Sequence, residues 1–319
     1  MKKFALLAMI VLSGLSCSTT VARFQDSAGH IIRIIDVGRA THHPDGHYYI
    51  VDKGHRRILK FDGLQRLKWE VGPQIAPDLE FTDTLDVAVG RGGTLYALDS
   101  VNQTLTLISA EGKVQSVVHL KDCQVPVPTP LAIACGQDNT VWIADWLNNT
   151  LVQLDSQGRY VSHFRLNRPD QHIYVHVPGT LKTDADTLYV LDQIESRVVA
   201  YSQDGRVLRQ YAFPGFRSMK EFVVAPHGAL YGLNGPKSEI QLVSDQNTLK
   251  KWKDTDPKTF FLPAALLKAT PEGVYVMGLT IPKTRPRLED QMIEDSKNFL
   301  RHLNRTPITV RFVHLTSII

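Results

Sequence analysis

The chain has 319 residues and a formal net charge of +4, with 43% hydrophobic and 21% charged residues. This composition is ordinary for a folded protein and excludes a largely disordered chain. No run of Lys and Arg interleaved with aromatic residues occurs, so the sequence does not indicate nucleic-acid binding. The length allows one large domain or two small ones.

The first residues have the pattern of an export signal rather than of a fold. A cationic start is followed by Phe4–Leu15, which carries no charge and is too short to span a bilayer. The stretch ends in small residues and Cys17, and it resembles the lipobox of bacterial lipoproteins, although Gly14 stands where Leu is usual. The resemblance implies that residues 1–17 are a signal peptide, that Cys17 is lipidated, and that residues 18–28 are a tether. Ordinary cleavage near Cys17 is the alternative.

Ser18 follows the cysteine, and in lipoproteins of this kind it does not signal inner-membrane retention. The resemblance therefore implies a bacterial envelope location with a lipid anchor, and it favours the outer membrane. Two cysteines remain, Cys123 and Cys135. The repeat described next separates them by about 13 Å of strand at ~3.3 Å per residue. A disulfide requires Cα atoms within about 7 Å, so this spacing argues against a bond.

An internal repeat covers residues 29–319. An aspartate column recurs at intervals of 42 to 47 residues, and an aromatic residue stands three positions before each member. In the first five units an aliphatic residue follows six positions later, a hydrophobic residue nine positions later, and a glycine or asparagine near the thirteenth. The first column comprises Asp52, Asp99, Asp145, Asp192, Asn234 and Gly278; the second comprises Tyr49, Tyr96, Trp142, Tyr189, Tyr231 and Tyr275.

Each unit predicts about four short strands, and a period of 40–50 residues is typical of β-propellers. We expect the aspartates to bind backbone amides of their own loops, a structural task rather than a catalytic one. The stretches IVDKGHRRILKFDG, VWIADWLNNTLVQLDSQG and LYVLDQIESRVVAYSQDG resemble NHL-repeat propellers. The resemblance implies an all-β, six-bladed propeller and says little about chemistry.

The ends of the chain predict how the ring closes. The third strand of the sixth unit is delayed to residues 308–315, and residues 29–37 form an orphan strand before the first unit. We therefore expect strands from both termini to complete the last blade, which removes free sheet edges. Residues 280–306 interrupt this blade, and partly helical spacing between prolines predicts a short helical insertion on the face of the channel mouth.

Equivalent positions near the start of each innermost strand place three charged residues at the mouth of the central channel. These are Arg39, Asp86 and Glu221; the other three positions hold Ala132, Gly179 and Leu266. The charged groups either pair with one another or form a site for a small polar ligand. A divalent metal held by Asp86 and Glu221 is a further alternative. A zinc site with histidine ligands is disfavoured, because the histidines do not recur near successive inner strands.

No Gly-x-Ser-x-Gly elbow, His-Glu-x-x-His motif or phosphate-binding glycine loop occurs, so the sequence contains no complete catalytic constellation and predicts no cofactor. The leading hypothesis is an envelope-anchored binding or scaffolding propeller. Its top face and insertion would be presented to a protein, peptide or glycan, and its lipid anchor to a membrane. The alternative is a metal-dependent lyase or lactone hydrolase that uses the channel mouth.

Overall fold

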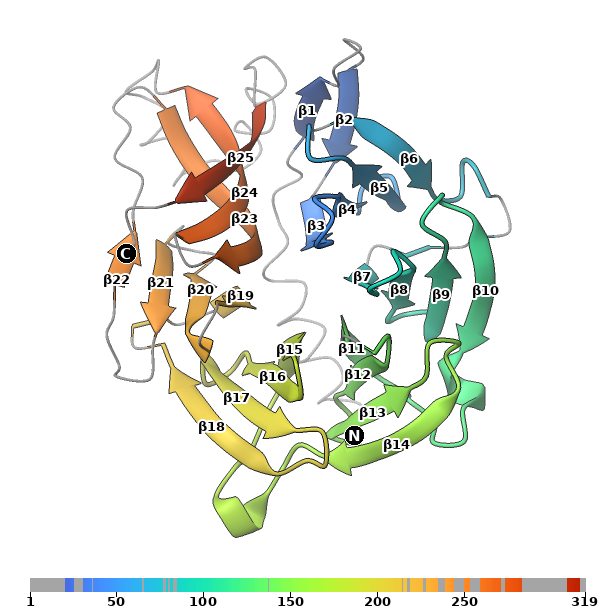
Figure 1. Cartoon of the computed structure of the whole chain (residues 1–319), viewed down its shortest axis with the longest axis vertical. Helices are drawn as coiled ribbons and strands as arrows, with labels where there is room; N and C mark the ends of the chain where they lie inside the picture. Colours follow the sequence, from blue (N-terminus) through green and yellow to red (C-terminus); the bar gives the residue numbers. More distant parts are fainter. Residues whose placement is uncertain are drawn as a thin grey trace, which may run out of the picture.

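The computed structural model describes residues 21–25, 31–35, 37–282 and 309–315, with gaps at 65, 77–78, 80, 83–84, 137, 214, 217–218, 226–227, 235–238, 244–249, 253–258 and 271–272. The described part is an all-β propeller whose sheets surround a central axis (Figure 1). Two single-turn 3-10 segments, η1 (Leu120–Asp122) and η2 (Pro169–Gln171), are its only helical elements.

Five regular four-stranded blades follow one another along the chain. Blade 1 comprises β3 (Val37–His42), β4 (Tyr48–Asp52), β5 (Arg57–Phe61) and β6 (Leu67–Val71). Blade 2 comprises β7 (Leu85–Val89), β8 (Leu95–Asp99), β9 (Thr104–Ile108) and β10 (Val114–His119). Blade 3 comprises β11 (Pro130–Cys135), β12 (Val141–Asp145), β13 (Thr150–Leu154) and β14 (Tyr160–Arg165).

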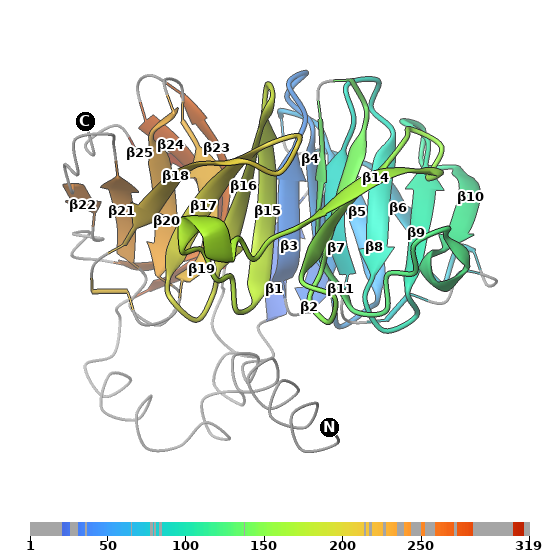
Figure 2. The same ribbon diagram turned by 90° about the horizontal axis from the view of Figure 1, so that it is seen from below.

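Blade 4 comprises β15 (Pro178–Asp184), β16 (Thr187–Asp192), β17 (Arg197–Ser202) and β18 (Val207–Ala212). Blade 5 comprises β19 (Met219–Val224), β20 (Leu230–Asn234), β21 (Glu239–Val243) and β22 (Lys250–Trp252). Every pair of adjacent strands within these blades is antiparallel. The first strand of each blade lies at the axis, and Figure 2 shows the ring from the side.

The remaining sheet, which we call the terminal sheet, has five strands in the order β2-β1-β25-β24-β23. Its members are β1 (Val21–Gln25), β2 (Ile31–Ile35), β23 (Thr259–Thr270), β24 (Gly273–Pro282) and β25 (Thr309–Leu315). Strand β1 runs parallel to β25 and pairs with it at Arg23 and Thr309. The inner strand β23 contacts β19 on one side and β3 on the other, so the terminal sheet completes the ring. This sheet combines β1 and β2 from the N-terminal part of the chain with β23, β24 and β25 from the C-terminal part.

Three expectations need correction. The structure has five regular blades rather than six, because the terminal sheet gains a fifth strand from the N-terminal hairpin of β1 and β2. Residues 21–25, expected within the tether, form β1 because their backbone pairs with β2 and β25. Strand β24 continues to Pro282, beyond the expected start of the insertion at residue 280. Residues 283–308, which include most of the expected helical insertion, lie outside the described residues. Among the described residues there is no α-helix.

The core lies between the sheets, where side chains of consecutive blades interlock. Among the described residues, each hydrophobic cluster takes members from two neighbouring sheets. The repeated aromatic residue of the second strand is buried in all five blades: Tyr49, Tyr96, Trp142, Tyr189 and Tyr231. Burying one such side chain removes about 150–250 Å² from water, so the aromatic column supplies much of the interblade packing.

The turn glycines explain how neighbouring blades approach each other. Gly158 and Gly205 have φ values of 81° and 83°, in the left-handed region that favours glycine. A Cβ atom on Gly158 would lie 2.7 Å from Val118, and one on Gly205 would lie 2.6 Å from Phe164. Both contacts are with the outer strand of the preceding blade. The glycines therefore provide the positive φ of these turns and also permit close packing of neighbouring blades.

Candidate functional site: the channel mouth and the top face

The innermost strands begin on one face of the ring, which we call the top face. The loops that join second to third strands, and those that join successive blades, open onto this face. The channel-mouth residues lie here, because Arg39 is in β3, Asp86 in β7 and Glu221 in β19. The structure brings Arg39 and Asp86 together, with Nε 3.7 Å from Oδ1. Glu221 pairs instead with Lys182 of β15, whose Nζ lies 3.7 Å from Oε1.

The guanidinium of Arg39 reaches across the channel from blade 1 to blades 4 and 5. Its Nη2 donates a hydrogen bond to the carbonyl of Gly179 at 2.7 Å, and its Nη1 donates to Thr180 Oγ1 at 3.0 Å. A longer contact of 3.5 Å joins Nη1 to the carbonyl of Lys220. The planar fork of arginine suits such a multiple contact. Arg39 therefore connects three inner strands in addition to neutralising Asp86.

Asp86 and Glu221 each bind the backbone of the next inner strand. Asp86 Oδ2 accepts a hydrogen bond from the amide of Ile133 at 3.1 Å, and Glu221 Oε2 accepts one from the amide of Leu266 at 3.1 Å. Both carboxylates are largely buried. The mouth is thus a ring of mutually satisfied charges, which is the pairing interpretation of the sequence pattern.

Outside the channel, the aspartate column anchors the top-face loops in blades 2 and 3. Asp99 accepts hydrogen bonds from the amide and hydroxyl of Thr82, both at 2.8 Å, and from the amides of Val101 and Asn102, both at 3.1 Å. Asp145 accepts from the amide of Thr129 at 3.0 Å. The prediction that this column binds backbone amides is confirmed for both residues.

In blade 3, burial sets the ionisation of the anchoring residue. Burial raises the pKa of Asp145 above its ordinary value, and hydrogen bonds from Thr129 and Asn148 oppose the rise. Asn148 Nδ2 donates to Asp145 Oδ2 at 2.7 Å. The donors in blades 2 and 3 are thus amides and hydroxyls without charge.

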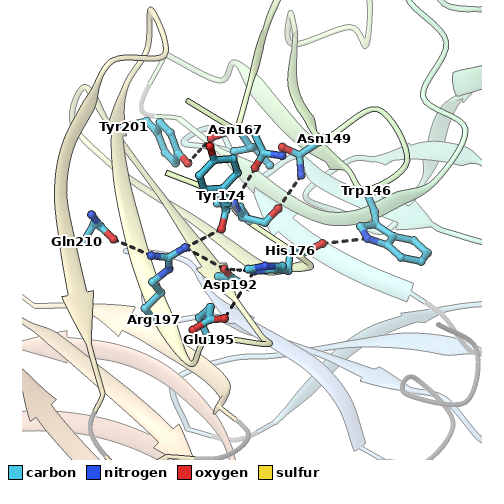
Figure 3. A network of polar contacts seen from close by, with 12 residues as sticks. Trp146, Asn149, Asn167, Tyr174, His176, Asp192, Glu195, Arg197, Tyr201 and Gln210 are labelled. Atoms are coloured by element: carbon cyan, nitrogen blue, oxygen red, sulfur yellow. Dashed lines mark hydrogen bonds and ion pairs between the residues drawn. The ribbon is translucent and has the colours of Figure 1, made fainter. Parts of the chain in front are cut away.

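Blades 1 and 4 use histidine and arginine partners at the same repeat position. Asp52 Oδ2 lies 2.7 Å from His55 Nδ1 and 3.0 Å from Arg57 Nε. Asp192 Oδ2 lies 3.3 Å from His176 Nδ1 and 3.4 Å from Arg197 Nη2 (Figure 3). The arginine stands five residues after the aspartate in both blades. Asp192 is fully buried, and its Oδ1 has no hydrogen-bond partner among the described residues.

The loop between β14 and β15 is held over blade 4 by three side chains that bind consecutive carbonyls. Arg197 Nη2 donates to the carbonyl of Tyr174 at 2.6 Å, and Asn149 Nδ2 donates to that of Val175 at 2.8 Å. Trp146 Nε1 donates to the carbonyl of His176 at 3.0 Å (Figure 3). We call residues 174–176 the strap. Because its donors come from two blades, the strap links blade 3 to blade 4.

Three aliphatic side chains project from the tips of the top-face loops. Val101, Leu147 and Ile194 are 61%, 69% and 52% exposed, and each stands two residues after the aspartate of its blade. Tyr174 of the strap is 50% exposed. The sequence reasoning missed these residues because it followed the positions that repeat for packing. Comparing the second position after each aspartate would have found them, since blade 1 has Gly54 there.

The structure places the remaining sequence candidates as follows. Cys123 and Cys135 are free thiols, as their predicted separation indicated. Burial raises the pKa of the Cys135 thiol to about 12. Cys17, the expected lipidation site, lies outside the described residues. Within the described part, no cluster of three or more His, Cys, Asp or Glu side chains is arranged to hold a metal ion, and no helix there is long and apolar enough to cross a membrane.

Comparison with known proteins adds structural likeness at low sequence identity. No protein-family model and no curated protein matches the chain. A streptogramin B lyase structure superposes with a TM-score of 0.58 at 13% identity, covering 92% of this chain and 87% of that one. Virginiamycin B lyase from Staphylococcus aureus gives a TM-score of 0.57 at 14% identity, covering 81% and 84%.

PorZ, described as a bacterial surface component of the type-IX secretion system of Porphyromonas gingivalis, gives a TM-score of 0.50 at 12% identity, covering 80% of this chain and 33% of that one. Enzymes and a secretion-system component thus share this architecture. At such identities the likeness establishes the fold and leaves the chemistry open. This chain is a β-propeller of the architecture that these proteins share.

Proposed function

We propose that this chain is an envelope-anchored binding or scaffolding propeller that presents its top face to a protein, peptide or glycan partner. The observation that carries the proposal is the contrast on that face between paired charged groups and exposed aliphatic side chains. The charges of the channel mouth bind one another and the neighbouring strands, whereas the loop tips of blades 2 to 4 expose aliphatic side chains. Exposed apolar groups that gather on one face are typical of interaction sites.

The anchor in this proposal is a lipid on Cys17, which follows a cationic start and an uncharged stretch of signal-peptide length. The envelope location, with the outer membrane favoured, rests on the same pattern. The proposal also keeps the resemblance to NHL-repeat propellers, which rests on the repeated stretches of the sequence. The likeness to a secretion-system surface component is compatible with a scaffolding role but does not distinguish it from the enzymes of the same fold.

A photo-crosslinking amino acid tests the use of the top face. It would replace Leu147 or Ile194 on that face and, as matched controls, Gln157 or Gln203 in exposed turns on the opposite face. Irradiation of living cells of the source organism should give the same partner adduct, identified by mass spectrometry, at both top-face positions and not at the controls. Adducts at the opposite face alone, or at neither face, would overturn the proposed function.

The anchor has its own test. Cys17→Ser should move the protein from the membrane fraction to the soluble fraction after cell lysis, because the acylated thiol is lost. Metabolic labelling with a clickable fatty acid should mark the wild-type protein and not the variant. Unchanged fractionation together with an unlabelled wild-type protein would remove the lipid anchor from the proposal.

A further inference from the structure

The top face between blades 3 and 4 combines apolar and acidic groups around the strap. Leu147 and Ile194 stand at the tips of the β12–β13 and β16–β17 loops, with Tyr174 and His176 of the strap and Glu195 as the other exposed members. We call these five residues the strap surface. Blade 1 has the same Asp and Arg pair but carries Gly54 at the tip position. The apolar tips are therefore a property of particular blades rather than of the repeat.

The strap surface is held in place before any partner arrives. The carbonyls of all three strap residues accept side-chain hydrogen bonds, and the amide of Val175 donates to Asn167 Oδ1 at 2.7 Å. Tyr201 supports the same connection, because its hydroxyl donates to the carbonyl of Leu166 at 2.8 Å. A loop fixed in this way loses little conformational entropy on binding, which favours affinity. These contacts leave the ring of Tyr174 half exposed.

The charge beside the apolar tips is negative. Glu195 has a half-exposed side chain, and its Oε1 lies 3.9 Å from His176 Nδ1. The buried Asp192 lies behind the same imidazole and has one oxygen with no donor among the described residues. Arg197 is turned inward, where its guanidinium binds Tyr174 O, Gln210 and Asp192 (Figure 3). One exposed carboxylate, that of Glu195, thus stands beside the apolar tips, and the arginine nearby is already engaged with the buried Asp192.

We propose that the strap surface docks a peptide segment of a protein partner in which an apolar side chain is flanked by Lys or Arg. This inference rests on the proposed function and narrows its partner class. The aliphatic tips of Leu147 and Ile194 offer apolar contacts to such a side chain, and Glu195 complements the cation. A glycan is a poorer fit, because the projecting tips are aliphatic and the indole N–H of Trp146 is already bound to the strap.

A phage-displayed library of random heptapeptides, panned against the purified protein, is the probe. The enriched peptides should carry an apolar residue next to Lys or Arg, and a synthetic peptide of that sequence should bind by fluorescence anisotropy. The double variant L147E/I194E should weaken this binding at least tenfold. V161E/L208E is the matched control, because both side chains are similarly exposed but lie on the outer strands β14 and β18. It should leave binding unchanged.

Charge exchange gives a second measurement. Glu195→Lys should weaken binding of the enriched peptide at least fivefold. A peptide in which the cationic residue is replaced by Glu should bind this variant more tightly than it binds the wild type. Absence of enriched peptides, or equal binding to wild type and L147E/I194E, would overturn the inference. If top-face adducts still form in cells under either result, the proposed function stands and only the peptide chemistry is wrong. Binding to a glycan array without enrichment of any peptide would likewise overturn the peptide inference and leave the proposed function standing.

Discussion

Blades 2 and 3 differ from blades 1 and 4 in how they satisfy the same buried carboxylate. Asp99 and Asp145 bind uncharged amide and hydroxyl donors, including the backbone just before their inner strand. Asp52 and Asp192 bind a histidine and an arginine. All four aspartates are fully buried. The carboxylate is thus common to these four blades, whereas its hydrogen-bond donors differ. In blade 4 the arginine that binds the carboxylate also holds the strap.

The largest expected effect separates Asp99 from Asp192. Both oxygens of Asp99 accept hydrogen bonds, so in Asp99→Asn the new amide group must face a donor. We expect a loss of about 2–3 kcal/mol in the free energy of unfolding, measured by urea denaturation. Asp192→Asn can direct its amide toward the side of Oδ1, which has no donor, so it should cost at least about 1 kcal/mol less. Equal losses would contradict the distinction.

An intermediate effect is expected when blade 4 is given the residue of blade 3. Arg197→Thr copies Thr150 and removes the donors to Asp192, Tyr174 O and Gln210. A loss of about 1–2 kcal/mol should follow, because a hydrogen bond contributes about 0.5–1.5 kcal/mol net and somewhat more when one partner is charged. Amide hydrogen exchange should also rise in residues 173–177. Arg159→Ala is the control, since Arg159 is an exposed ion-pair partner and should cost less than about 0.5 kcal/mol. Unchanged protection of the strap amides from hydrogen exchange in Arg197→Thr would contradict this prediction.

The smallest expected effect is on the pH dependence of stability, and it compares Asp145 with Asp155 of blade 3. Burial raises the pKa of Asp145, so its stabilising contribution is present at low pH and declines as the pH rises through the folded-state pKa. Burial acts in the same direction on Asp155, but hydrogen bonds from Arg159 outweigh it and leave the pKa lowered. Its contribution is present above the unfolded-state pKa of about 3.9 and is lost as the pH falls.

Urea denaturation from pH 3 to 6 can separate the two groups. The destabilisation caused by Asp145→Asn should shrink as the pH rises, whereas that caused by Asp155→Asn should grow. Slopes of the same sign for the two variants would show that the two carboxylates do not titrate in opposite directions.

The fold was largely predictable because it depends on positions that recur. The buried aromatic, the aspartate and the turn glycine recur at nearly constant spacing in most blades, so their spacing alone indicates strands and turns. The terminal sheet was predicted less well. The pairing of β1 with β25 joins the two ends of the chain, and its register depends on closure of the ring rather than on a local pattern.

The candidate site was less predictable for the same reason. Sequence placed Arg39 and Asp86 at the channel mouth, but the reach of Arg39 to Gly179 depends on the width of the channel. The strap requires Trp146, Asn149 and Arg197 to meet carbonyls from a different loop, and no spacing rule reports such contacts. Exposed tips carry no packing constraint, so they vary between copies and are invisible to a search for repeats.

The parallel pairing of β1 with β25 sets an order of events for the newly made chain. Residues 21–25 are synthesised long before residues 309–315, so their shared sheet cannot assemble until β25 has been made. Contacts so distant in sequence make folding slow. The blades between them can form while the circle still has a gap. Completing the circle is therefore a late step, and the same seam is where the mature ring would first come apart under force or denaturant.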